Sequence, residues 1–200
     1  MHGETTGARP GPGSRLWDAA WLLVMAATFW AVASMAFSSA YDVHPDESDH
    51  VGAGRYYMQY WDPPKVGDER ARGAYSNYGI SYLDQLDVVY FFAGKFARLI
   101  APLAGQDYMG LRLFNVGLFL WLMFLCFRLK GARRMAFAPL FLTPQAWYVF
   151  SYFNGDALPL ALCFMAVYLF ARMPLPSGGS TGRLALKLGL VIGLLAISKQ

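Results

Sequence analysis

The sequence predicts an all-α membrane protein with about five transmembrane helices and a long extracytoplasmic first loop that carries amphipathic helices. Of its 200 residues, 56% are hydrophobic and only 15% are charged, whereas a soluble domain usually has about 25% charged residues. Five long apolar runs are each close to the length that crosses a bilayer. The charges are also unevenly placed, because residues 39–84 hold eight of the 13 acids but only four of the 17 bases.

The charge asymmetry predicts an orientation for the chain. Outside residues 39–84 the net charge is +8, and bases gather in the loops that face the cytoplasm. The basic segments are the N-terminal tail, the turn around residues 128–134 and the loop 172–183. We therefore expect a plasma membrane protein, of the bacterial inner-membrane type, with a cytoplasmic N-terminus. Membrane lipids are the expected surroundings. A nucleic-acid partner is not expected, since no basic stripe with interleaved aromatics occurs outside the apolar runs.

The apolar runs define the expected domain organisation. Residues 1–15 are rich in Gly, Pro, Thr and Ser and predict a disordered cytoplasmic tail. The predicted spans cover residues 17–37, 109–129, 135–153, 157–172 and 184–198, and an outer loop covers 39–108. Because the chain stops directly after the fifth apolar run, we expect residues 16–200 to be the N-terminal part of a larger transmembrane domain.

The segment Leu86–Leu103 is apolar but is not predicted to span. Lys95 and Arg98 lie in its middle, and a cation at the bilayer centre costs roughly 2.5–3.5 kcal/mol on insertion scales. A spanning segment would also move the basic turn at 128–134 to the side of the acidic loop. We expect an amphipathic helix at the membrane interface.

The sequence YDVHPDESDH, at residues 41–50, holds the strongest candidates for chemistry. Proline followed by two acids predicts that a helix starts near Pro45 and continues to about Trp61, before two prolines. Asp46 and Glu47 are the candidate catalytic residues, because a partly shielded carboxylate can act as a general base. The alternative is that both acids only complement the dipole of the helix.

The histidines of this stretch extend the candidate site. On a helix His50 shares a face with Asp46 and Glu47, which are four and three residues before it. His44 and His50 are candidate substrate-binding residues, and Asp46, Glu47 and His50 are the candidate ligands of a divalent metal. The alternative is a set of solvated side chains in an acidic loop.

A second polar cluster, Asn154–Gly155–Asp156, interrupts the later hydrophobic sequence. These residue types suit a tight turn between helices. By the count of spans, the turn faces the same side as the acidic loop. Asn154 and Asp156 are therefore candidate substrate-binding residues, and the outer bases Arg55 and Lys199 are candidate partners of a substrate phosphate.

The order of these motifs resembles the GT-C superfamily of multi-spanning glycosyltransferases, which includes the protein O-mannosyltransferases and the lipid A aminoarabinose transferases. The matching residues are Pro45–Asp46–Glu47 after the first span, Tyr152–Asp156 in a later outer turn, and Lys199 after the fifth apolar run. The similarity covers nearly the whole chain as the N-terminal part of such an enzyme.

The resemblance implies a reaction. A polyprenyl-phosphate-linked sugar would be the donor, and Asp46 would deprotonate the hydroxyl of an acceptor that the sequence does not identify. Glu47 would orient that base or help to bind phosphate or metal, and Asn154 and Asp156 would support the site. The later spans of the family would still be needed, so we expect this part alone to be inactive.

The alternative function is a transporter or a ligand-binding membrane protein whose acidic loop binds a cation or substrate without chemistry. A transporter usually has ionisable groups at bilayer depth. In this sequence Asp18, Arg112 and Lys187 lie near the ends of the predicted spans. The polar residues gather outside the spans instead, which favours chemistry at the interface.

Overall fold

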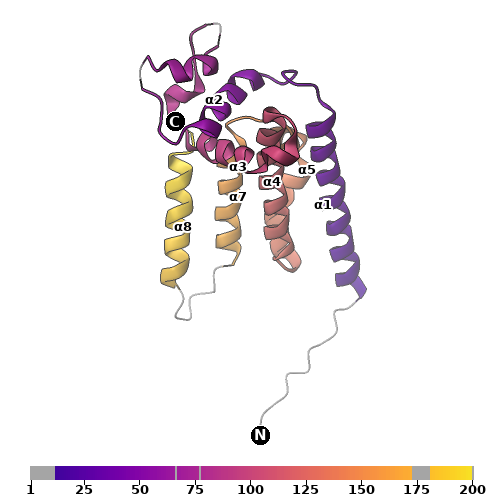
Figure 1. Ribbon diagram of the computed structural model, residues 1–200. Helices are drawn as coiled ribbons and strands as arrows, with labels where there is room; N and C mark the ends of the chain where they lie inside the picture. The colour runs from indigo at the N-terminus through magenta and orange to yellow at the C-terminus, as the bar shows by residue number, and fades with distance from the viewer. Residues whose placement is uncertain (1–11, 66, 77, 173–180, 200) are drawn as a thin grey trace.

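The computed structural model describes residues 12–65, 67–76, 78–172 and 181–199, and these ranges contain helices and no strand. Four helices form an upright bundle in which α1 packs against α4, α4 against α7 and α7 against α8 (Figure 1). Their bounds are Pro12–Ser38 for α1, Asp107–Phe127 for α4, Ala157–Ala171 for α7 and Thr181–Ala196 for α8. The disordered tail predicted for residues 1–15 lies mostly outside the described residues, and α1 begins earlier than expected.

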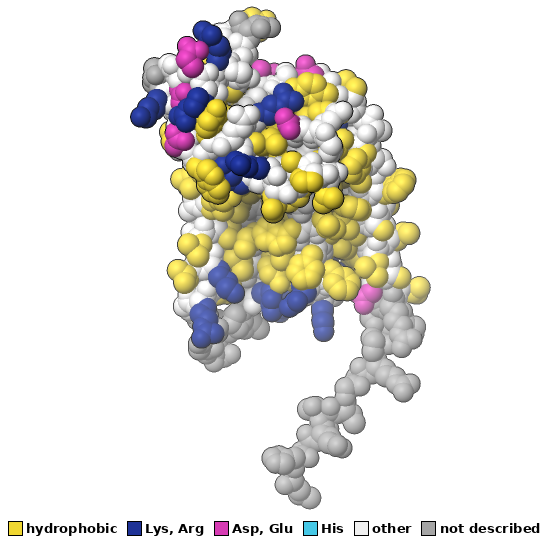
Figure 2. Space-filling view, in the orientation of Figure 1, with side chains coloured by type: hydrophobic (Ala, Val, Ile, Leu, Met, Phe, Trp, Pro, Cys, Tyr) yellow, Lys and Arg dark blue, Asp and Glu magenta, His cyan; other side chains and the backbone are white. Residues whose placement is uncertain are grey.

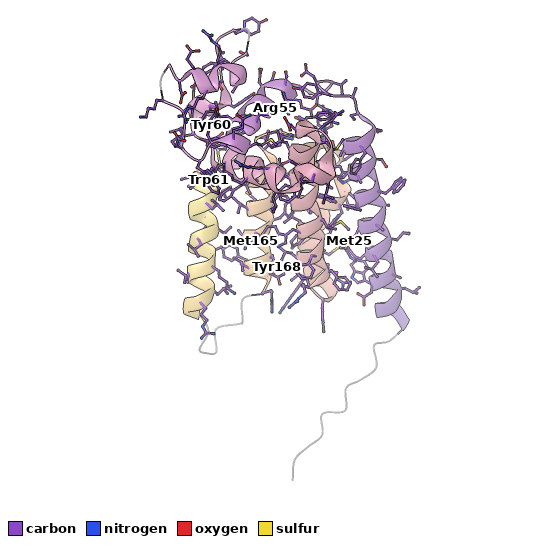
Figure 3. The ribbon with its side chains drawn as sticks, in the orientation of Figure 1. Met25, Arg55, Tyr60, Trp61, Met165 and Tyr168 are labelled. Carbon is purple, nitrogen blue, oxygen red and sulfur yellow. The ribbon has the colours of Figure 1, made fainter. Side chains whose placement is uncertain are left out.

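The predicted membrane class is confirmed by the surface and the helix lengths. Residues Leu16–Ser38 and Asp107–Phe127 are long and apolar enough to cross a bilayer, and Ala157–Ala171 is a shorter apolar helix. Figure 2 shows a band of hydrophobic side chains between two charged ends. Inside the bundle lie Met25, Met165 and Tyr168 (Figure 3). Exposing a hydrophobic band of this size to water would cost free energy. The band therefore indicates a surface that contacts lipid.

The outer loop folds into a helical layer across one end of the bundle (Figure 1). It contains α2 (Glu47–Gln59), the short 3-10 helices η1 (Glu69–Ala74) and η2 (Tyr82–Gln85), and α3 (Val88–Ala104). The helix predicted from Pro45 thus begins two residues later, and Pro45 lies outside it.

Helix α3 packs directly on α2, as an interfacial helix would. A Cβ atom added at Gly94 would lie 2.7 Å from the carbonyl oxygen of Gly54 and 2.8 Å from the carbonyl carbon of Tyr57. Only glycine allows the two backbones to come this close.

The two bases of α3 bind the C-terminal end of α2. Lys95 Nζ donates to the carbonyl oxygen of Tyr60 at 2.7 Å and lies 4.0 Å from the centre of the Trp61 ring. Arg98 Nη1 donates to the carbonyl oxygen of Met58 at 3.0 Å. These contacts satisfy carbonyls that a helix end leaves unpaired and place positive charge at the negative end of the dipole.

The apolar run at 135–153 is not one helix. It is divided among η3 (Gly131–Phe137), α5 (Ala138–Leu142) and α6 (Pro144–Ser151). The break falls at Thr143, whose backbone is extended (φ −109°, ψ 110°). The residue before a proline is driven out of the helical region, so Pro144 ends one helix and begins the next. The continuous helix predicted for this range was wrong.

Candidate functional site

Glu47 forms a buried ion pair with Arg112 of α4. Arg112 Nε donates to Oε1 at 2.6 Å and Nη2 donates to Oε2 at 2.7 Å, and both side chains are fully buried. The guanidinium also donates to the carbonyl oxygens of Ala36 and Ser39 through Nη1 and to that of Ala40 through Nη2, at 2.8–2.9 Å. Every N–H of the guanidinium therefore has a partner.

The same pair shapes the turn that follows α1. Glu47 Oε2 accepts the backbone N–H of Asp42 at 3.1 Å, and Asp42 Oδ1 accepts the backbone N–H of Ser48 at 3.1 Å. Asp42 itself has a left-handed backbone, with φ 64°. Glu47 thus holds the loop from inside the protein, which gives it a positioning role. It is not exposed to a substrate or metal, contrary to its place in the predicted ligand set.

Asp46 is the exposed carboxylate of the motif. It precedes α2 with a left-handed backbone (φ 54°, ψ 16°), and its side chain makes no capping hydrogen bond to the helix. Non-glycine residues in this region are strained and gather at functional sites, although Asp tolerates it better than most. Tyr82 lies nearby, with its hydroxyl 3.4 Å from Asp46 Oδ2. Asp46 is therefore presented to solvent by the rigid turn that Glu47 holds.

His50 lies largely enclosed among aromatic side chains. Its Nδ1 shares a 2.8 Å hydrogen bond with the hydroxyl of Tyr90, and its ring stacks on Tyr82 with centroids 4.0 Å apart. Burial lowers the pKa of His50 to about 4, although Asp156 and Asp46 act in the opposite direction. The imidazole is therefore neutral at neutral pH. The pKa of Tyr90 is raised by burial as well, so its hydroxyl keeps its proton.

The second polar cluster does meet the first. A Cβ atom at Gly155 would lie 2.9 Å from the Tyr90 hydroxyl and 3.9 Å from Cε1 of His50. Asn154 builds the turn: Nδ2 donates to the carbonyls of Val149 and Tyr152, and Oδ1 accepts the backbone N–H groups of residues 156 and 157. Because Asn154 is buried and its amide is fully used, it supports the site and does not itself face a substrate.

Asp156 and Lys199 form an ion pair at the rim of this cluster. Both side chains are about half exposed. Both charges also act on His50, which places them close to it. The structure thus brings together Asp46, His50, Asp156 and Lys199, which the sequence had named separately.

His44 lies beside the cluster in an aromatic setting. Its ring stacks on Tyr152 with centroids 4.6 Å apart, and Nδ1 is 3.1 Å from the hydroxyl of Tyr148. Nε2 is buried without a hydrogen-bond partner. Burial lowers the pKa of His44, so this imidazole is also neutral at neutral pH.

Arg55 does not join the cluster. It is five residues after His50 on α2, which is about 140° around the helix. Its Nε lies 3.4 Å from Asp107 Oδ2, and its guanidinium lies over the ring of Tyr41. Arg55 therefore lies apart from the cluster, and its role as a partner of a phosphate stays a prediction.

No metal centre is formed by the described residues, since no three His, Cys, Asp or Glu side chains converge there. Glu47 is held by Arg112, so it cannot join Asp46 and His50 around an ion. Sequence reasoning missed Tyr82 and Tyr90 altogether. The available signal was weak, because Tyr is common at membrane interfaces for reasons of solvation alone.

Comparison with known proteins agrees with the fold. No curated protein and no solved structure matches this chain. Residues 46–200 match the model of a family described as predicted membrane protein (DUF2142). The match takes in the helical layer that contains α2 and α3, and the rest of the bundle after α1. Because it covers well over half of the sequence, the chain belongs to this family of predicted membrane proteins.

Proposed function

We propose that the protein provides the catalytic face of a glycosyltransferase that uses a polyprenyl-phosphate-linked sugar. The observation that carries the proposal is the position of the polar cluster. Asp46, His50, Asp156 and Lys199 come together near an apolar groove of about 470 Å³, whose lining residues Leu158 and Leu194 are two and five residues from Asp156 and Lys199 along the chain. An amphiphilic donor needs this combination of a charged site and an apolar channel.

The groove is formed by α3, α4, α7 and α8. Leu158 of its lining lies two residues after Asp156, and Leu194 lies five residues before Lys199. Trp121, Met165 and Val191 continue the apolar surface. An isoprenoid chain in the groove would place its phosphate near Lys199. Lys199 could then leave its ion pair with Asp156 and pair with the phosphate instead.

The cluster supports the following roles. Asp46 takes the proton of the acceptor hydroxyl as the acceptor oxygen attacks the anomeric carbon of the sugar. The bond from that carbon to the phosphate oxygen breaks, and the phosphate leaves with the electron pair. Attack opposite the leaving group inverts the anomeric carbon. Lys199 stabilises the departing phosphate, and Glu47 positions Asp46 through the turn.

The proposal includes an orientation. The cluster would face the outside of a bacterial plasma membrane, and the N-terminus would be cytoplasmic. The end of the bundle opposite the cluster carries Arg128, Lys130, Arg133 and Arg134, as the cytoplasmic side normally does.

The transporter alternative gains little support from the charges, apart from Lys187 of α8, which lines the groove. The ranges 19–38, 113–127, 157–171 and 188–198 contain no Asp, Glu, Lys, Arg or His. Ionisable groups that bind a transported ion are expected at that depth. The buried pair of Glu47 and Arg112 lies instead at the junction of α1, α2 and α4, with its hydrogen bonds satisfied.

The test is Asp46→Asn in the full-length protein in membranes, assayed for sugar release from a radiolabelled polyprenyl-phosphate sugar. Asn keeps the size of Asp but lacks the basic oxygen, so transfer should fall about 10²–10⁴-fold. Asp49→Asn, in the first turn of α2, is the matched control and should retain transfer. Wild-type transfer by a folded Asp46→Asn protein would exclude Asp46 as the base. Ion-dependent substrate uptake without sugar release would instead favour the transporter.

A further inference from the structure

We infer that the cleft beside Arg55 binds the headgroup of an anionic phospholipid, separately from the site around Asp46. The cleft has a volume of about 370 Å³ and lies where α2, α3 and α4 meet. Its polar lining residues are Arg55, Gln59, Arg98 and Asp107. This inference goes beyond the proposed sugar transfer and does not depend on it.

The two arginines have donors left for a phosphate. Arg98 uses only Nη1 for the carbonyls at the end of α2. Arg55 has a single ion pair, from Nε to Asp107 at 3.4 Å, and its side chain is 45% exposed. The forked N–H groups of arginine match the oxygens of a phosphate. One phosphate group between Arg55 and Arg98 would therefore complete the hydrogen bonding of both.

The cleft lies at the depth of lipid headgroups. Arg55 and Tyr60 lie at the same end of the bundle as Trp61 (Figure 3). Trp61 is 71% exposed, and the neighbouring helix α3 presents Leu99 and Leu103 at 79% and 89% exposure. An exposed tryptophan beside exposed leucines is typical of the border between headgroups and acyl chains. The leucines offer a surface for the acyl chains of the lipid whose phosphate the arginines hold.

A second cleft extends from the first and suits a hydroxylated headgroup. It has a volume of about 310 Å³ and shares Arg55 and Gln59 with the first. Tyr56 lines it, and the hydroxyl of Tyr56 is buried without a hydrogen-bond partner. A headgroup oxygen could accept from this hydroxyl, since an unpaired buried hydroxyl is costly. The glycerol of phosphatidylglycerol has the oxygen atoms for this contact, and phosphatidylcholine has neither the net charge nor the hydroxyls.

Asp107 gives the inference a sharp test because it competes with the phosphate for Arg55. Binding of phosphatidylglycerol and of phosphatidylcholine is titrated by native mass spectrometry on the full chain, with no sugar donor or acceptor. Arg55→Gln should weaken phosphatidylglycerol binding about fivefold, the usual effect of one base near an anionic surface. Asp107→Asn should strengthen it, a gain that misfolding cannot produce.

Arg72→Gln is the matched control. Arg72 lies in η1, is 82% exposed and pairs with Glu69, and it lines neither cleft. It should leave lipid binding unchanged. Tyr56→Phe should reduce the preference for phosphatidylglycerol over phosphatidate, which lacks the glycerol headgroup.

Three results would overturn the inference. Equal binding of phosphatidylglycerol and phosphatidylcholine would show that the cleft does not select charge. Equal effects of Arg55→Gln and Arg72→Gln would show only general electrostatic attraction. Displacement of phosphatidylglycerol by millimolar inorganic phosphate or by polyprenyl phosphate would assign the cleft to a free anion or to the sugar donor.

Discussion

Two carboxylates that are adjacent in the sequence, Asp46 and Glu47, have opposite environments. Glu47 is fully buried against Arg112, whereas Asp46 is exposed on the turn. A carboxylate that already accepts strong charge-assisted hydrogen bonds is a poor base, because its lone pairs are occupied. The difference explains how one motif can supply both a reactive group and the support that positions it.

Glu47→Gln should destabilise the protein by about 3–5 kcal/mol, because it leaves the Arg112 guanidinium buried without a counter-charge. Denaturant unfolding in detergent measures the change. Glu69→Gln is the control, since Glu69 forms an exposed pair with Arg72 and should show no measurable effect. Equal stability of the two variants would contradict the structural role of Glu47.

His50 should make stability depend on pH. Burial holds its pKa near 4, below the ordinary value of 6.5. Between these values the unfolded chain takes up a proton that the folded protein does not bind, so stability should decrease as the pH falls from 6.5 to 4. The full effect is up to about 3 kcal/mol. Unfolding measured across this pH range should be flatter for His50→Gln, and an unchanged profile would refute the assignment.

At the scale of elements, the helical layer across the end of the bundle is held together by close backbone contact between α2 and α3. Gly94 lies against Gly54 and Tyr57. The bases Lys95 and Arg98 then bind the end of α2. Both features fix α3 against α2. The two helices that carry His50 and Tyr90 therefore hold a constant position relative to each other.

Gly94→Ala should weaken the packing of α3 on α2 and lower the stability of the protein. The added methyl group would overlap the backbone of α2, at a cost of about 1–3 kcal/mol. Gly117→Ala, in α4, is the control because nothing lies within 4 Å of its added Cβ. That change should be neutral or slightly stabilising. Thermal unfolding in detergent compares them, and equal melting temperatures would argue against the close contact.

Helices could be predicted from the sequence where hydrophobic composition and the positions of charged residues agreed. The helix predicted at Leu86–Leu103 is present as α3, although the sequence could not show that Lys95 and Arg98 bind the end of α2. Its location at a membrane interface stays a prediction. The break at Thr143 was missed because the apolar composition of residues 135–153 outweighed the prolines Pro139 and Pro144. The contact of Tyr90 with His50 was also missed, since it joins residues 40 positions apart with no periodic signal.

The whole molecule has two charged ends and an apolar band between them (Figure 2). One end holds the acidic loop and the candidate site. At the other end Arg134 Nη1 contacts Asp18 Oδ1 at 2.6 Å. This contact ties α1 to the basic turn after α4. The distribution defines a direction across the membrane that labelling can measure.

Cysteines at Tyr78 and Gln106 should both react with an impermeant thiol reagent added outside cells, and a cysteine at Ala132 should not. The native Cys126 and Cys163 are first replaced by alanine. The expected pattern follows from the positive-inside rule and from the interfacial position of α3. Labelling of the cysteines at positions 78 and 106 from different sides would mean that α3 spans the membrane. Labelling of Ala132 alone would reverse the orientation.

The overall class and the shared side of the two polar motifs could be predicted because both depend on composition and on counting spans. The ion pair of Asp156 and Lys199 was not predicted, although both residues were named as candidates. The separation of Arg55 from His50 was predictable from their spacing of five residues on one helix, whereas its pairing with Asp107 of α4 was not.

The contact between Glu47 and Arg112 also sets an order of events during biosynthesis. The turn that presents Asp46 is held by a guanidinium that enters the chain 65 residues after Glu47. A ribosome that has released only α1 and α2 has not yet made the group that organises this turn. We therefore expect the candidate site to take shape only once α4 has been made, and a translation pause before Arg112 to leave the acidic loop without this support.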